Sequence, residues 1–168
     1  PTPEAIARYL QENDKDITNA VIPNSGLNKD GSVCLSFGQS RLWLLDQLQG
    51  PSSTYNMPQA IKLRGSLNIE GLRQSLTKLY ERHQSLKTVI KKDDLGQPKG
   101  YILSNPSSDQ VLTVLDLSAS TGEDLSTKLN NEITREISHP FNLDKDYSLR
   151  TKLIKIQEDE FILILTLH

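Results

Sequence analysis

The chain has 168 residues, which suits one ordinary domain, and 36% of them are hydrophobic and 24% charged. A net charge of −2 without a basic stripe excludes nucleic acid as an expected partner, and the single cysteine, Cys34, excludes a disulfide framework. The histidines are scattered, so no metal site is predicted. No apolar run reaches the roughly 18–20 residues that a membrane span needs. No secretion signal is found at the start of the sequence. We therefore expect a cytoplasmic protein that meets no membrane.

The first part of the chain is predicted to hold one helix and one linker. Thr2 can cap a helix with Pro3 in its first turn, and this helix would lie within residues 1–13. Residues 14–34 are polar, rich in Asn, Asp, Lys and Gly, and lack periodicity, which is typical of a linker. Residues 35–168 are therefore expected to form the folded unit.

Two helices are predicted in the first half of that unit. Ser36 and Gln39 fit a capping box, in which each side chain satisfies a free backbone N–H, and Trp43 follows on an apolar face. A strand over 58–63 precedes the second helix, which Asn68 caps. The apolar stripe of this helix consists of Ile69, Leu72, Leu76, Leu79, His83 and Leu86.

Short strands and one more helix are predicted next. The strands are expected over 87–91, 101–103 and 111–117. Residues 120–123 fit a second capping box, and the helix that follows should end at His139-Pro140. Its apolar residues recur every four positions, at Leu125, Leu129, Ile133 and Ile137.

The last two predicted strands are strongly apolar. Segments 149–156 and 161–167 flank an acidic turn and predict a hairpin. Mixed helices and strands with a terminal hairpin predict an α/β sandwich, one sheet covered by helices. The final strand stops on His168 without a turn or cap, so we expect a truncated lobe of a larger domain.

Three stretches carry a resemblance to a known family. They are Ser36-Phe-Gly-Gln-Ser-Arg-Leu-Trp-Leu-Leu45, Arg82-His-Gln-Ser-Leu-Lys-Thr-Val-Ile90, and Pro140-Phe-Asn-Leu143 with Leu149-Arg150. They are similar to S-x-A-Q-x-R-L/M-W/Y-x-L, R-H-E-x-L-R-T-x-F and P-F-D-L…L-R, and together they resemble the condensation domains of nonribosomal peptide synthetases. The departures are Gly38, which loosens the helix start by roughly 1 kcal/mol, and Gln84, Lys87 and Ile90, which weaken any ion pairing carried there.

The resemblance implies a fold of the chloramphenicol-acetyltransferase-like, CoA-dependent acyltransferase type, with 35–168 as its truncated amino-terminal lobe. It also implies that Thr166-Leu-His168 leads into the family's H-H-x-x-x-D-G, with His168 as the first histidine in an orienting or structural role. The catalytic second histidine would be the next position, so the fragment itself is expected to be inactive. The other motif residues, expected to be structural, are Ser36, Gln39, Arg41, Trp43, Arg82, His83 and Arg150.

The implied reaction is amide formation between an acyl thioester on an upstream carrier domain and the amine of an aminoacyl thioester on a downstream peptidyl carrier. A histidine can accept a proton from that amine or hydrogen-bond to it, and both roles stay open. No cofactor is expected to bind directly, because phosphopantetheine belongs to the carriers. Residues 1–10 resemble the last helix of an acyl carrier domain of modular polyketide synthases, which implies a hybrid polyketide–peptide synthetase.

Two alternative functions stay open. The same fold could belong to an epimerisation, heterocyclisation or free-standing acyltransferase relative, or to a non-catalytic carrier-docking module. In each case, Leu163 and Leu165 are expected to help build a face that the missing carboxy-terminal lobe would cover. We therefore expect self-association of the fragment.

The remaining polar residues receive structural interpretations. His83 is expected to be half-buried on its apolar stripe, and His139 to be a turn residue before a proline. Arg41 and Arg82 are expected to form a buried ion pair or to anchor their helices. Cys34 is expected to pack.

Overall fold

The computed structural model describes residues 27–168, so the predicted helix over 1–13 and most of the predicted linker lie outside the described residues. Its elements, in chain order, are α2 (Phe37–Gln49), β1 (Met57–Arg64), α3 (Ile69–Arg82), the 3₁₀ turn η1 (Gln84–Lys87), β2 (Thr88–Lys92), β3 (Pro98–Ile102), α4 (Ser108–Val111), β4 (Thr113–Asp116), α5 (Gly122–Ser138), β5 (Leu149–Gln157) and β6 (Glu160–Leu167). This confirms the predicted mixture of helices and strands.

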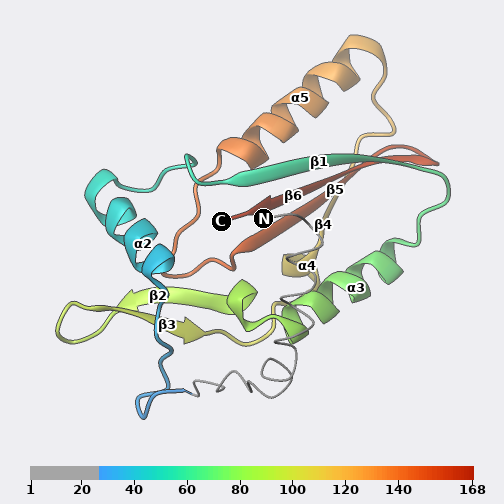
Figure 1. Cartoon of the computed structure of the whole chain (residues 1–168). Coiled ribbons are helices and arrows are strands. Elements are labelled where there is room, and N and C mark those ends of the chain that lie inside the picture. The colour runs from blue at the N-terminus through green and yellow to red at the C-terminus, as the bar shows by residue number, and fades with distance from the viewer. Residues whose placement is uncertain (1–26) are drawn as a thin grey trace, which may run out of the picture.

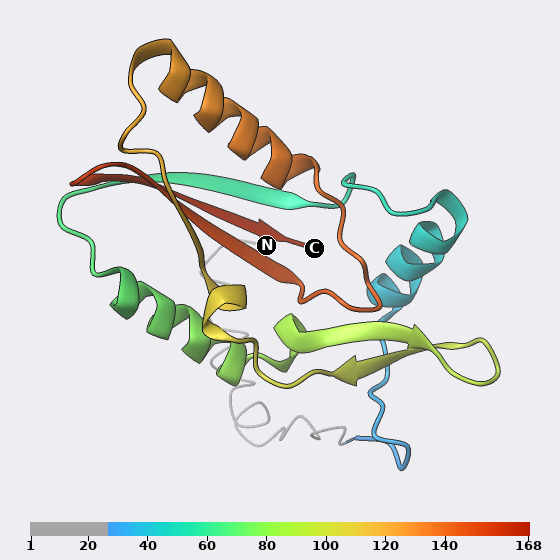
Figure 2. The same ribbon diagram turned by 180° about the vertical axis from the view of Figure 1, so that it is seen from behind.

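The larger sheet has four strands in the order β1-β6-β5-β4, and β2 and β3 form a separate two-stranded sheet. The predicted hairpin is present, with β5 antiparallel to β6 and Leu153 opposite Leu163. Strand β1 pairs antiparallel with β6, and β4 pairs parallel with β5. Helices α5 and α3 lie on opposite sides of this sheet (Figure 1, and from behind in Figure 2), which is the predicted sandwich.

The main core lies between α3 and one face of the sheet. Leu76 and Tyr80 of α3 pack with Leu153 of β5 and Leu163 of β6 in one cluster of buried residues. Leu163 is only 7% exposed, and Leu165 packs against the same cluster. The prediction that these two leucines build an exposed face was therefore wrong, because α3 covers them.

Helix α5 covers the other face of the sheet. Its Glu132 and Glu136 carboxylates bind the ammonium of Lys152, which projects from β5 and has a side chain only 9% exposed. The predicted capping box at the start of α5 is absent: Thr121 is the N-cap and makes no side-chain hydrogen bond. The Ser120 hydroxyl instead accepts a hydrogen bond from Lys128, further along the helix.

Two other predicted elements differ from the structure. Helix α3 ends at Arg82, and His83 is its C-cap in an extended conformation with φ −112° and ψ 97°. His83 is therefore exposed, not half-buried on the apolar stripe. The strand predicted over 111–117 is shorter, because Val111 closes α4 and β4 begins at Thr113.

The described end of the predicted linker packs against β3. Val33 and Gly100 exchange backbone hydrogen bonds of 2.8 and 3.1 Å, and a Cβ at position 100 would lie 2.6 Å from the Val33 side chain. Glycine is therefore required at this close approach. No helix within residues 27–168 is long and apolar enough to cross a bilayer.

Candidate functional site

Helix α2 supplies one wall of the candidate site, and its first turn has the predicted capping box. The Gln39 N–H donates to the Ser36 hydroxyl at 3.2 Å, and the Ser36 N–H donates to the Gln39 side chain at 2.9 Å. Trp43 is buried, as predicted, and the Lys92 ammonium lies 5.6 Å from its ring centroid. The cap and the tryptophan hold α2 so that Gln39 and Leu42 line the site.

The loop between α5 and β5 supplies the second wall. Arg150, near the start of β5, donates to the carbonyls of His139 at 2.6 Å and Pro140 at 3.1 Å. Its guanidinium carbon lies 3.9 Å from the ring centroid of Phe141, a cation–π distance. Arginine and ring together fix the direction in which this loop leaves α5.

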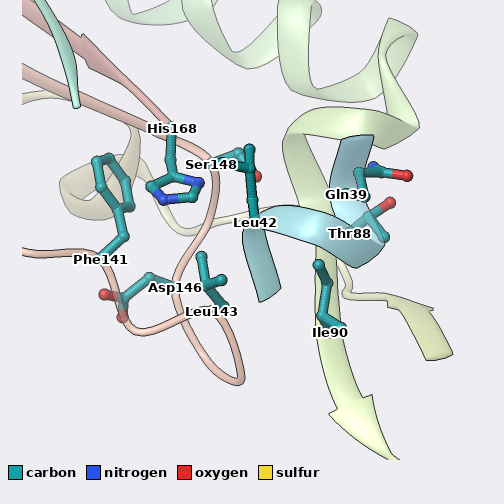
Figure 3. A pocket seen from close by; sticks show the side chains of 9 residues that line it. All are labelled: Gln39, Leu42, Thr88, Ile90, Phe141, Leu143, Asp146, Ser148 and His168. Carbon is teal, nitrogen blue, oxygen red and sulfur yellow. The ribbon is translucent and has the colours of Figure 1, made fainter. Parts of the chain in front are cut away.

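His168 lies where these walls meet. Its backbone N–H donates to the Ser148 carbonyl at 3.0 Å, and its ring centroid is 5.6 Å from that of Phe141, with the planes tilted by 60°. Figure 3 shows the imidazole between Phe141 and the Leu42 side chain of α2. Among residues 27–168, no group forms a hydrogen bond to its ring nitrogens.

A cavity of about 80 Å³ borders the imidazole. Three elements line it: α2 through Gln39 and Leu42, β2 through Thr88 and Ile90, and the 141–148 loop through Phe141, Leu143, Asp146 and Ser148. The lining is mainly apolar, with amide, hydroxyl and carboxylate groups among it. Such a site can hold a small apolar group beside an imidazole.

Burial favours the neutral form of this imidazole. Burial lowers the pKa of His168 below its ordinary value of 6.5, the nearby Asp46 carboxylate opposes this shift, and the Arg150 charge adds to it. A neutral imidazole has one donor and one acceptor nitrogen, so it can accept a proton or orient a polar group.

The structure brings together three residues that the sequence singled out: Gln39, Arg150 and His168. Arg41 and Arg82 are exposed and have no ion-pair partner among residues 27–168, so the predicted buried ion pair was wrong, whereas helix anchoring stays a prediction. Arg41 lies in α2 and Arg82 ends α3, at positions where water can hydrate both guanidinium groups.

Cys34 and His139, which the sequence also singled out, do not line this cavity. Cys34 is exposed rather than packed, because it follows Val33, which bridges to β3, and successive side chains of an extended segment alternate in direction. His139 is the exposed C-cap of α5, as expected of a turn residue.

Sequence reasoning missed three residues near the imidazole: Phe141, Asp146 and Asp46. Phe141 was quoted within a motif but given no role, although an aromatic residue after His-Pro at a helix end is a visible signal. The two aspartates carried no local signal. Within the part of the chain that the structure describes, no cluster of three or more His, Cys, Asp or Glu residues could hold a metal ion.

Comparisons with known proteins found a family model and relatives that match this chain. The family model described as "Condensation domain" matches residues 29–168. One relative, a probable non-canonical nonribosomal peptide synthetase, CymA, from Salinispora arenicola (strain CNS-205), is 36% identical over 99% of this chain and 2% of that protein. Another, malpinin synthetase from Mortierella alpina, is 33% identical over 100% of this chain and 2% of that protein. The chain thus spans about 2% of the length of these relatives.

Solved structures give the same assignment of fold. The starter condensation domain of rhizomide synthetase RzmA superposes with a TM-score of 0.70 at 22% identity, over 82% of this chain and 32% of that one. The first condensation domain of the calcium-dependent antibiotic synthetase gives 0.68 at 20% identity over the same shares. The predicted fold type is confirmed, as a portion of that fold. Since the family match covers nearly all of the described residues, this chain belongs to the condensation domain family.

Proposed function

We propose that residues 29–168 form part of a condensation domain within a longer synthetase, and that this domain joins two carrier-bound groups through an amide bond. The amine of an aminoacyl thioester on a downstream carrier would attack the acyl thioester on an upstream carrier. The new C–N bond forms as the C–S bond breaks, and the upstream carrier leaves with a free thiol. The family match and relatives named as nonribosomal peptide synthetases support this proposal.

The observation that carries the proposal is the position of the His168 imidazole at the edge of an apolar cavity, where burial lowers its pKa. The amine must be unprotonated and aligned with the thioester carbon, and a fixed neutral imidazole suits both needs. We assign His168 the orienting role. In the family motif that Thr166-Leu-His168 resembles, the catalytic histidine comes directly after it. Phosphopantetheine would enter only as the carrier arm that bears each thioester.

A chimaera tests this function. Residues 29–168 would replace the matching portion of the rhizomide synthetase starter condensation domain, a mutant of which has been crystallised with C8-CoA and Leu-SNAC. With these two compounds, we expect the chimaera to form the amide, detected by mass spectrometry. The 168-residue chain alone should form none. A folded chimaera that gives no amide would overturn the proposal.

A second candidate is a non-catalytic module that docks carriers. Its support is the α2 stripe, defined here as Phe37, Leu44 and Leu48, which are 99%, 52% and 74% exposed on one side of the helix. This candidate predicts that the 168-residue chain binds a carrier domain, that Leu44→Asp abolishes the binding, and that the folded chimaera remains inactive. Amide formation by the chimaera would exclude it.

A further inference from the structure

The carboxyl end of α5 is held by two side chains from outside the helix, Asn56 and Arg150. The last carbonyls of a helix lack partners within it. Here the Asn56 amide donates to the carbonyls of Ile137 and His139, both at 2.9 Å. Arg150 donates to the carbonyls of Glu136 at 3.3 Å, His139 at 2.6 Å and Pro140 at 3.1 Å. The segment after α5 therefore starts from a fixed point.

Arg150 is used here in an unusual way for a half-buried arginine. Among residues 27–168 it has no carboxylate within ion-pair distance, and its hydrogen bonds go to backbone carbonyls. Burial lowers the pKa of its guanidinium, while the charges of Glu136 and Asp146 oppose the shift. An arginine remains charged in proteins, so this position holds a cation without a direct counter-ion.

The same guanidinium connects to the imidazole through one aromatic ring. Its carbon lies 3.9 Å from the ring centroid of Phe141, which is 3% exposed, and this ring lies 5.6 Å from that of His168. Arginine stacks on aromatic faces in a way that lysine does not, because its fork is planar. The order of contacts is α5 end, Arg150, Phe141, His168.

We propose that Arg150 is a positioning residue: by clamping the end of α5 and stacking on Phe141, it holds the imidazole of His168 in its orientation beside the cavity. This role deepens the proposed function, on which its catalytic meaning rests. The geometry and its test do not depend on condensation activity.

Charged groups reach His168 from three elements. Asp46 comes from α2, Arg150 from β5, and Asp146 from the loop that lines the same cavity, whereas β2 contributes only Thr88 and Ile90. Removing Arg150 would remove a nearby positive charge and release Phe141, which shields the imidazole. Both changes raise the pKa of His168, because burial and the arginine charge are what lower it.

The test is an NMR titration of the 168-residue chain. It has only three histidines, so the ring protons of His83, His139 and His168 can be followed separately. For Arg150→Met we expect the pKa of His168 to rise toward its ordinary value near 6.5, and the NOE between the Phe141 and His168 rings to disappear. Arg150→Lys keeps the charge without the planar fork and should lose the NOE with a smaller pKa rise. Arg135→Met, an exposed arginine on α5 paired with Glu132, is the matched control and should change neither.

Phe141→Leu is an independent test, because it leaves the hydrogen bonds from Arg150 to the end of α5 in place. It should also raise the pKa of His168, and it keeps the test decisive if Arg150→Met does not fold. A lower melting temperature for Arg150→Met with an unchanged His168 pKa and an intact NOE would overturn the inference. An unchanged His168 pKa in Phe141→Leu would overturn it as well. Either result would leave the proposed amide formation untouched, because the chimaera tests that separately.

Discussion

The hydroxyl of Tyr80, on α3, donates a 2.6 Å hydrogen bond to the backbone carbonyl of Leu149, the first residue of β5. Tyr80 is fully buried, so this carbonyl has no water to replace the lost donor. We expect Tyr80→Phe to lower the free energy of unfolding by about 1–3 kcal/mol in urea titrations. Tyr55→Phe, at a 40% exposed tyrosine, should change it by less than about 0.5 kcal/mol. Equal effects of the two substitutions would contradict this.

Tyr80 also predicts how the fold responds to alkali. Burial, and then the nearby Tyr147, raise the pKa of Tyr80 to about 12 from its ordinary value of 10. The folded state therefore keeps this proton more tightly than the unfolded state. The resulting stability is complete below pH 10 and is lost as the pH rises from 10 to about 12. Denaturant midpoints measured across this range should fall for the parent chain and fall less for Tyr80→Phe.

His168 predicts the response to mild acid. Its pKa is lowered in the folded state, so folding favours the neutral imidazole. The stability that this contributes is complete above the ordinary pKa of 6.5 and is lost as the pH falls from there through the lowered value. We expect the free energy of unfolding to decline in this window, and His168→Gln to remove part of the decline. His83→Gln, at an exposed site, should leave it intact.

The carboxylates of Asp116 and Glu160 affect stability in a separate, more acidic pH range. Hydrogen bonds from Ser118 lower the pKa of Asp116, and the Lys62 side chain lowers that of Glu160. Stability linked to these groups is lost only below their ordinary values of 3.8 and 4.5. A decline near pH 6 that persists in His168→Gln at full size would therefore contradict the histidine assignment.

The buried ammonium of Lys152 predicts a large substitution effect. It lies between the carboxylates of Glu132, at 3.2 Å, and Glu136, both less than a fifth exposed. Lys152→Met leaves Glu136 without a cation and Glu132 with only the exposed Arg135, so we expect a loss of about 3–5 kcal/mol in unfolding free energy. Adding Glu132→Gln and Glu136→Gln to it should recover much of that loss. Lys128→Met, which breaks an exposed pair with Asp124, should have a much smaller effect.

The α2 stripe predicts the behaviour of the isolated chain. Three large apolar side chains exposed on one helix face are a surface that a second copy can cover. We expect light scattering to detect self-association at high concentration, and Leu44→Asp with Leu48→Asp to reduce it. Leu95→Asp, at an 84% exposed turn leucine, is the control. A monomeric parent chain would contradict this prediction.

Local signals explain what the sequence could predict. The Ser36–Gln39 box, the Asn68 cap and the acidic turn before β6 are each decided by residues within a few positions, and all three are present. The His83 prediction failed because periodicity counts side chains and cannot detect where the backbone leaves the helix. The box predicted at 120–123 failed because α5 begins one residue later, with Thr121 as its N-cap, which leaves the Ser120 hydroxyl to accept from Lys128.

The candidate site could be predicted only in part. Motifs identified Gln39, Arg150 and His168, but the cavity depends on α2, β2 and the 141–148 loop meeting in space. The Arg150–Phe141 contact spans a loop whose path follows from the clamp on α5. No spacing rule for helices or strands describes such a path, so this relationship needed the structure.

The pairing of β1 with β6 has a consequence for biosynthesis. Met57 of β1 is paired with Leu167 of β6. Strand β1 therefore cannot form this pairing until nearly the whole described chain has been translated. At ~5–20 residues per second, that delay is on the order of 10 s. Throughout it, one long strand edge is unpaired and open to wrong partners in a crowded polysome. Pro58 and Lys62 of β1 disfavour strand addition at an edge. They therefore reduce wrong strand pairing during synthesis as well as in the folded protein.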